Sequence, residues 1–83
     1  MYYLYILKSF QKDWHYIGIT ANIENRLAEH NAGEVKSTKA YQPLILLHKE
    51  QFLNKTEARK REIFLKKNAK ARKELFSQFG PIV

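Results

Sequence analysis

The sequence predicts an α+β domain in which a three-stranded, mainly antiparallel sheet is flanked by helices. Two short runs of alternating aromatic and aliphatic residues begin the chain, at residues 2–7 and 15–20, and a third apolar run occupies residues 44–52. Between and after these runs lie segments with helical periodicity and capping residues. The expected order is strand, strand, helix, strand, helix, helix, within a single domain spanning residues 1–83.

The first two runs have the pattern of a β-hairpin. Tyr3, Tyr5 and Leu7 share one side of the first run, and Tyr16 and Gly18 share one side of the second, because side chains in a strand have period two. The polar connection contains no Asn-Gly or Asp-Gly, so a longer loop is expected. A buried tyrosine needs a hydrogen-bond partner, so several tyrosines in a small sheet indicate a polar centre.

A helix of about three turns is expected next, because Asn22 can cap it and Gly33 follows its end. The spacing i, i+3, i+4, i+7 defines the stripe that faces the sheet: Ile23, Arg26, Leu27 and His30.

Two members of this stripe, Arg26 and His30, are polar. Burying an arginine is costly unless it is paired or faces a cleft. Either the helix is rotated and Arg26 pairs with a neighbouring glutamate at the surface, or a cleft between sheet and helix brings Arg26 and His30 together with Tyr5 and Tyr16. Residue types alone leave both interpretations open.

Residues 34–42 are polar and basic and predict a surface loop before Pro43. Two hydroxyl side chains lie between lysines in this loop, which suits contact with a phosphate: Lys36, Ser37, Thr38 and Lys39. The apolar start of the run at residues 44–52 predicts a third strand that is central or covered on both faces at its start.

Asn54 or Thr56 is expected to cap a second helix that continues to about Lys67. Its apolar stripe comprises Ala58, Leu65 and Ala69, with Ile63 and Phe64 alongside. After a weak point at residues 68–69, a short amphipathic helix follows, with Leu75, Phe76 and Phe79 on its apolar side and its end at Gly80-Pro81.

Glu62 lies on the apolar stripe of the second helix rather than on its basic face. A carboxylate in that position is neutralised by a cation, an arginine or a bound metal. The alternative is a pair with Arg59 or Lys66 one helical turn away, which contributes only about 0.2–0.5 kcal/mol.

Charge and composition narrow the function classes. The net charge is +7, and nine of the fifteen basic residues lie within residues 54–74. A one-sided basic surface favours nucleic acid as partner, although solvated lysines that keep a small protein soluble explain it too. The chain has no cysteine, no signal-peptide pattern and no membrane-length apolar run, so we expect a soluble cytoplasmic protein without membrane contact. HExxH, CxxC, GxGxxG, P-loop and nucleophile-elbow motifs are absent.

Four elements in order resemble the GIY-YIG nuclease family over nearly the whole chain. Residues 3–5 (YLY) are similar to its first tripeptide, with tyrosine in the position of glycine, and residues 16–18 (YIG) are its second. Arg26 and His30 resemble the family's R-x-x-x-H/Y segment, and Glu62 resembles its metal-binding glutamate.

The small single-domain branch of the family shows the greatest likeness, because the run at residues 54–62 and the Ser-Thr-Lys stretch at 37–39 are similar to that branch. The domain also resembles the N-terminal nuclease domain of the excision-repair endonuclease. Larger members carry an asparagine near the end of the core, for which Asn68 is the only candidate here.

The resemblance implies a metal-dependent DNA endonuclease, or a nuclease-like protein, that hydrolyses phosphodiester bonds in DNA repair or processing. Glu62 would bind a single Mg²⁺ or Mn²⁺, and Arg26 would hold a phosphate oxygen. Tyr5, Tyr16 or His30 would orient or deprotonate the attacking water; a free phenol has a pKa of about 10 and a free imidazole one of about 6.5. The expected nucleic-acid contacts are Lys36, Ser37, Thr38, Lys39, Arg59 and Lys66.

Two other function classes stay open from the sequence. A nucleic-acid-binding module without catalysis is consistent with the basic segment and with the poorly matched Asn68. An interaction adaptor would use its lysines only for solubility. DNA is a better expected partner than RNA, and a homodimer or partner protein is compatible with a double-strand cut.

Overall fold

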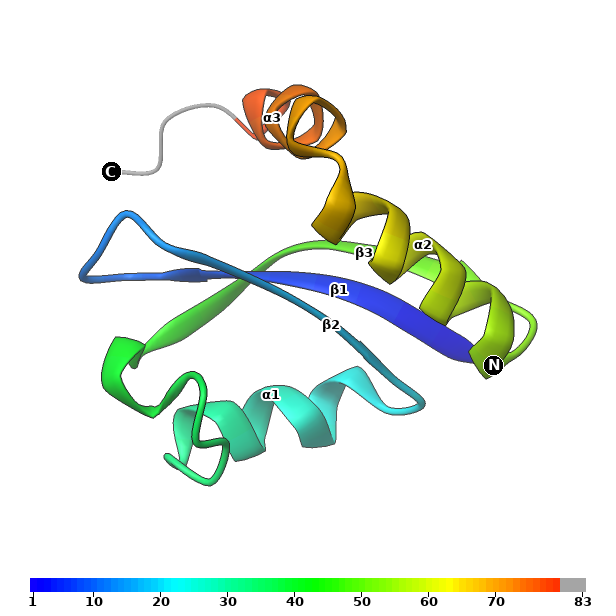
Figure 1. The fold of residues 1–83 in the computed structure, drawn as a ribbon. Coiled ribbons are helices and arrows are strands. Elements are labelled where there is room, and N and C mark those ends of the chain that lie inside the picture. The colour runs from blue at the N-terminus through cyan, green and yellow to red at the C-terminus, as the bar shows by residue number, and fades with distance from the viewer. Residues whose placement is uncertain (80–83) are drawn as a thin grey trace.

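Three antiparallel strands and three α-helices follow one another in the order that the sequence predicts. The structure, a computed structural model, describes residues 1–79. The elements are β1 (Tyr2–Ser9), β2 (His15–Thr20), α1 (Ile23–Asn31), β3 (Leu44–Phe52), α2 (Lys55–Lys67) and α3 (Ala69–Ser77), with a 3-10 turn at Lys39–Tyr41 (Figure 1). The expected helix end at Gly80-Pro81 lies outside the described residues. None of the helices in the described part is long and apolar enough to cross a membrane.

The strand order is β2-β1-β3, so β1 is the central strand. Tyr5 pairs with Gly18 on one side and with Lys49 on the other. The prediction of a central third strand is wrong, because β3 is an edge strand. Its apolar start has another cause: Leu44 is buried and Leu46 packs beside it on the face that α1 covers.

The two faces of the sheet carry separate apolar clusters. Leu4, Ile6 and Ile17 pack with Leu65 of α2. On the opposite face, Tyr5, Leu7 and Leu44 form the other cluster, against which Ile23 and Leu27 of α1 pack. The helix α1 therefore covers one face while α2 and α3 lie over the other (Figure 1), and the predicted alternation of the strands is confirmed.

Asparagines define both ends of α1. The Asn22 side chain accepts a hydrogen bond from the Asn25 backbone N–H at 3.0 Å, as expected of a cap. Gly33 follows the helix with a φ of +77°, which favours glycine. The Asn31 amide donates to the Leu44 carbonyl at 2.9 Å and accepts from its N–H at 2.7 Å, which ties the end of α1 to the start of β3.

The helix α2 begins at the Asn54 cap and ends at Asn68, which in turn caps α3. Ala58 and Leu65 are buried as predicted, but Ile63 and Phe64 are 44% and 47% exposed. Successive helical residues are rotated by about 100°, so the two residues after buried Glu62 turn away from the sheet. Ala69 also departs from the expected stripe, because the chain changes direction at Asn68 and Ala69 starts the next helix on an exposed surface.

A polar contact joins α2 to β3. The Arg61 guanidinium donates to both Glu50 carboxylate oxygens, at 2.9 and 3.2 Å, and His48 Nε2 lies 2.8 Å from Glu50 Oε2. Burial alone would raise the pKa of Glu50, but Arg61 and His48 hold that pKa below its ordinary value.

Candidate active site

Tyr5 and His30 form the buried centre of the candidate site. Tyr5 projects from the middle of β1, and the phase of α1 turns His30, near the helix end, toward the sheet. The Tyr5 hydroxyl lies 2.9 Å from His30 Nε2. Since the two residues are only 2% and 0% exposed, this hydrogen bond satisfies the polar centre that the tyrosines predict.

Gly18 makes room for the Tyr5 ring. A Cβ atom at residue 18 would lie 2.6 Å from the Tyr5 hydroxyl and 3.0 Å from a carbon of the Tyr16 ring. Tyr5 on the central strand β1 pairs with Gly18 on the edge strand β2. Because Gly18 has no side chain, the Tyr5 ring can extend across β2. The Tyr16 ring lies 5.2 Å from the His30 ring and 6.2 Å from the Tyr5 ring, measured between centroids.

Arg26 shows one part of each interpretation that the sequence left open: the surface ion pair of the first and the approach to Tyr5 of the second. Its Nη1 donates to Glu29 Oε1 at 3.0 Å, a surface pair in which the Arg26 side chain is 37% exposed. The guanidinium also lies beside the Tyr5 hydroxyl, and the two contacts, Glu29 first, raise the pKa of Arg26. The helix phase is as predicted, so Arg26 faces the edge of the aromatic cluster.

The surroundings keep the phenol and the imidazole neutral. Burial raises the pKa of Tyr5 to about 12, and neighbouring Arg26 only partly opposes this effect. Burial and then the charge of Arg26 lower the pKa of His30 below its ordinary value. At neutral pH the Tyr5 hydroxyl therefore carries its proton, and His30 has one ring nitrogen free to accept one.

Glu62 approaches from the other side of the sheet. It is 9% exposed on α2, and its carboxylate contacts Arg59 Nε at 3.3 Å and Lys66 Nζ at 3.1 Å. The alternative that the sequence left open, pairing across one helical turn, is therefore what the structure shows, and it involves both Arg59 and Lys66. Tyr5, Arg26 and His30 gather beneath α1, whereas Glu62 belongs to the opposite layer, although its charge is close enough to add to the raised pKa of Tyr5.

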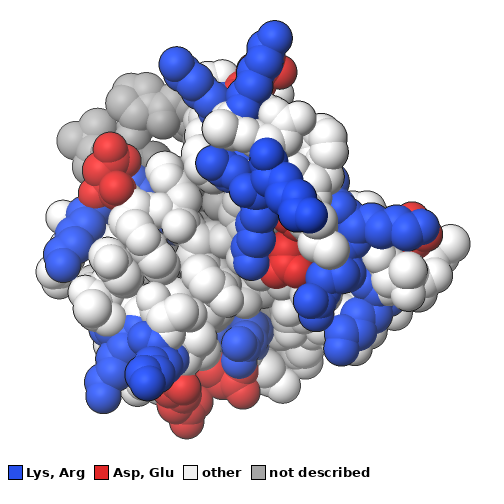
Figure 2. Space-filling view, viewed as in Figure 1, with Lys and Arg blue, Asp and Glu red and all other residues white. Residues whose placement is uncertain are grey.

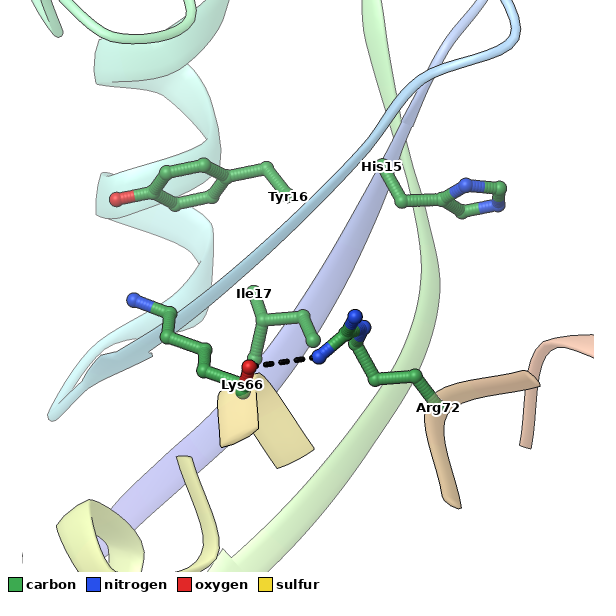
Figure 3. A pocket seen from close by; sticks show the side chains of 5 residues that line it. All are labelled: His15, Tyr16, Ile17, Lys66 and Arg72. Carbon is green, nitrogen blue, oxygen red and sulfur yellow. Dashed lines mark hydrogen bonds between the residues drawn. The ribbon is translucent and has the colours of Figure 1, made fainter. Parts of the chain in front are cut away.

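A pocket of about 290 Å³ lies along β2 between these two layers. His15, Tyr16 and Ile17 line it from β2, and Lys66 and Arg72 line it from α2 and α3 (Figure 3). Figure 3 shows the Tyr16 and Lys66 side chains extending in the same direction. The pocket therefore brings a tyrosine of the α1 face near the ion-pair partner of Glu62.

Two lining residues, His15 and Arg72, are not singled out by sequence reasoning. Arg72 Nη1 donates to the backbone carbonyls of Leu65 at 2.8 Å and Lys66 at 2.7 Å, which closes the end of α2. The His15 ring stacks on Phe76 with centroids 4.3 Å apart. Nothing in their spacing marks them, because both depend on how α3 folds back over the sheet.

The four residues of the loop at 34–42 that were expected to contact nucleic acid differ in their exposure to solvent. Lys36, Ser37 and Lys39 are exposed. Thr38 is fully buried, so the prediction that it contacts a phosphate from a surface loop is wrong. Its hydroxyl lies 2.7 Å from His30 Nδ1, and this contact draws the side chain inward.

The donor set fits a hard cation that keeps most of its water. In residues 1–79, no group of three or more His, Asp or Glu side chains is arranged to hold a metal ion. Mg²⁺ is commonly bound through one or two carboxylates together with water and substrate phosphate. The single carboxylate of Glu62 would be enough for such a cation, provided that Arg59 or Lys66 gives up its ion pair with Glu62.

Basic side chains gather over α2 and α3 on the face shown in Figure 2. Carboxylates over α2 and α3 lie among the lysines and arginines, and a separate group of carboxylates lies at the lower edge of this view. Arg59 and Lys66, both expected to contact nucleic acid, are exposed in this region despite their pairing with Glu62. Such a surface is electrostatically suited to a polyanion.

Comparisons with known proteins find matches over most of the chain. The model of the GIY-YIG catalytic domain matches residues 1–75. A UPF0213 protein of Halobacterium salinarum is 37% identical over 75 residues, which cover 89% of this chain and 96% of that protein. A UPF0213 protein of Natronomonas pharaonis is 42% identical over 74 residues, covering 88% and 86%.

A solved structure shares the fold. The solution NMR structure of a UPF0213 protein from Bacillus halodurans has a TM-score of 0.56 and 28% identity, and the match covers 95% of this chain and 84% of that one. Together with the order of the YLY, YIG, Arg26–His30 and Glu62 elements, these matches establish that the chain belongs to the GIY-YIG family, among its small UPF0213 members.

Proposed function

We propose that this protein is a divalent-metal-dependent endonuclease that hydrolyses phosphodiester bonds in DNA, with a role in DNA repair or processing. The observation that supports it best is the convergence of Tyr5, Tyr16, Arg26 and His30 beside an edge strand. The Tyr5–His30 hydrogen bond gives a polar, proton-transferring centre to a site that an extended polyanion can reach from the side.

In this proposal the residues of the α1 face divide the work between phosphate and water. Arg26 holds a nonbridging phosphate oxygen, which requires it to exchange Glu29 for the substrate. The phenol of Tyr5 or Tyr16 orients the attacking water. Where Tyr5 is that phenol, its oxygen takes a proton from the water while its own hydrogen passes to His30 Nε2, which is already within hydrogen-bond distance of the hydroxyl.

A single Mg²⁺ or Mn²⁺ held by Glu62 would supply stabilisation of negative charge on the phosphate and on the leaving oxygen. Glu62 is released for this task when Arg59 and Lys66 transfer their contacts from the carboxylate to phosphates. Lys36, Ser37 and Lys39 would add contacts from the other side of the α1 end.

A cleavage assay tests the proposal. Supercoiled, branched and single-stranded DNA are incubated with purified protein in Mg²⁺ or Mn²⁺, and Glu62→Gln and Arg26→Gln are each expected to reduce cleavage by at least about 100-fold. Glu57→Gln is the matched control, because Glu57 lies on the same helix in an exposed pair with Lys60. Cleavage that persists in both site variants would identify a contaminant and refute the assignment.

A nucleic-acid-binding module without catalysis is the second candidate. It is favoured by one observation, the double ion pair that holds Glu62 on the α2 layer. This candidate predicts that DNA binding is unaffected by chelation of divalent cations, whereas cleavage by the wild type would exclude it.

A further inference from the structure

A chain of buried hydrogen bonds leads from the candidate site into the loop before β3. Tyr5, His30 and Thr38 are all buried. The Tyr5 hydroxyl lies 2.9 Å from His30 Nε2, and His30 Nδ1 lies 2.7 Å from Thr38 Oγ1. Thr38 Oγ1 also donates to the Val35 carbonyl at 3.3 Å.

The last member of the chain sets its direction. A carbonyl oxygen only accepts, and a threonine hydroxyl has one hydrogen to donate. When that hydrogen is directed to Val35, Thr38 can only accept from His30. The hydrogen of the neutral imidazole must then be on Nδ1, and Nε2 is left with a lone pair toward Tyr5.

The other end of the chain is consistent with this direction. A guanidinium only donates, so the phenol hydrogen of Tyr5 cannot be directed to neighbouring Arg26. The phenol hydrogen then has His30 Nε2 as its acceptor. In residues 1–79, every buried side-chain nitrogen and oxygen has a partner, so the chain from Tyr5 through His30 to Thr38 contains no unpaired buried polar atom.

We propose that Thr38 is a positioning residue that selects the Nδ1-protonated tautomer of His30 and thereby leaves Nε2 free to accept the Tyr5 proton. The catalytic importance of this arrangement rests on the proposed nuclease function, but the tautomer itself does not. As the attacking water gives a proton to the Tyr5 oxygen, the phenol O–H bond breaks and an N–H bond forms at His30 Nε2, so Tyr5 stays neutral throughout. The imidazolium so produced keeps its Nδ1–H on Thr38, so the ring need not move.

The tautomer can be read directly by long-range ¹H–¹⁵N NMR of the full chain, at a pH where His30 is neutral. His15→Gln and His48→Gln spectra assign the three histidines. In the wild type we expect His30 Nδ1 to give the signal of a protonated nitrogen and Nε2 that of an unprotonated one. The reverse pattern would overturn the proposal.

Substitutions at Thr38 test the cause. Thr38→Val keeps the shape but cannot accept from Nδ1, so the tautomer population should shift toward Nε2–H. Thr38→Ser keeps the hydroxyl and should retain the wild-type pattern, and Ser37→Ala, on an exposed neighbour, serves as the matched control. An unchanged tautomer in Thr38→Val refutes the role of Thr38. Should Thr38→Val not fold, the wild-type spectrum still tests the proposal, because a proton on Nε2 of His30 would refute it. A tautomer in Thr38→Ser that differs from the wild type would also refute the role of the hydroxyl.

Kinetics separate this inference from the proposed function. If the wild type cleaves DNA, Thr38→Val should lower kcat by about 10- to 100-fold with little change in KM, and Thr38→Ser should restore it. Equal kcat values in Thr38→Val and the wild type would contradict a positioning role. A wild type that has the expected tautomer but cleaves no DNA refutes the nuclease proposal and leaves the assignment of Thr38 intact.

Discussion

Gly18 and Tyr5 depend on each other at the scale of single residues. The glycine is needed for space, since the Tyr5 hydroxyl occupies the position where a side chain would begin. Its backbone adopts no positive φ, unlike that of Gly33. The YIG tripeptide therefore has a packing explanation as well as a family one.

Gly18→Ala is expected to lower the free energy of unfolding by about 1–3 kcal/mol, the usual cost of overpacking a filled site. The new methyl group would displace the Tyr5 ring and break its hydrogen bond to His30. Urea denaturation measures the change. In a Tyr5→Ala background the same substitution should cost much less, and an equal cost in both backgrounds would show that the ring is not the cause.

The buried His30 ring predicts a stability that falls in mild acid. Its pKa is lowered by burial, so the unfolded chain binds more protons between that pKa and the ordinary value of about 6.5. Stability should therefore be constant above about pH 6.5 and decrease as the pH falls through the folded-state pKa. His15, whose pKa burial also lowers, contributes in the same direction.

Urea denaturation near pH 7.5 and near pH 5.5 checks this dependence, with His30→Gln and His15→Gln compared in turn. Each variant should lose less stability on acidification than the wild type does. A wild-type stability that is equal at the two pH values would contradict the expected loss of stability in acid.

Sequence reasoning located the tyrosines, Arg26 and His30 because period two and period 3.6 determine which side chains share a face. The role of Thr38 could not be found in this way. Its contact with His30 depends on the path of a loop, and no periodicity describes that path.

The contact between α2 and β3 is the clearest test at the scale of elements. Glu50→Gln removes the charge that receives two hydrogen bonds from Arg61 and is expected to cost about 1–2 kcal/mol of unfolding free energy near neutral pH. The difference should disappear as the pH falls below the folded pKa of Glu50, which is held under 4.5. Thermal unfolding across this range measures both effects.

Glu57→Gln provides the comparison for Glu50→Gln. Its pair with Lys60 is exposed on a single helix, with side-chain exposures of 52% and 70%, and such pairs contribute less than about 1 kcal/mol. If the two substitutions cost the same, the Arg61 contact does not hold α2 against the sheet.

Caps and apolar periods predicted the three α-helices and three strands of residues 1–79, including the interruption at Asn68, but not the 3-10 turn at Lys39–Tyr41. The position of β3 in the sheet was not predictable from its apolar start, because burial on a face and hydrogen-bonded neighbours are separate properties of a strand. Nor did the sequence indicate that α1 and α2 cover opposite faces, so it could not show that Arg26 and Glu62 belong to different layers.

At the scale of the whole molecule, the charge of +7 predicts binding that depends strongly on salt. The logarithm of the DNA association constant should fall linearly with the logarithm of salt concentration, with a slope of about −0.9 for each phosphate neutralised. Fluorescence anisotropy between about 50 and 200 mM salt measures this slope. An association constant that does not change with salt concentration would argue against a nucleic-acid partner.

Lysine substitutions map the surface that produces the slope. Lys70→Ala and Lys73→Ala, on α3, should each reduce its magnitude by about 1 if the face in Figure 2 contacts phosphates. Lys12→Ala is the control, because Lys12 lies away from α3, in the loop between β1 and β2. Its Nζ lies over the ring of Tyr41. A larger effect of Lys12 than of the α3 lysines would place the DNA elsewhere.

For the proposed nuclease, the position of the pocket beside β2 has a consequence for how a DNA strand would bind. Because the pocket opens at the rim of the sheet and not at the bottom of a closed chamber, an uninterrupted polymer can be laid across it and lifted away sideways. No free end of the polymer has to be threaded into the pocket. Such a rim suits attack within a strand better than trimming from its terminus.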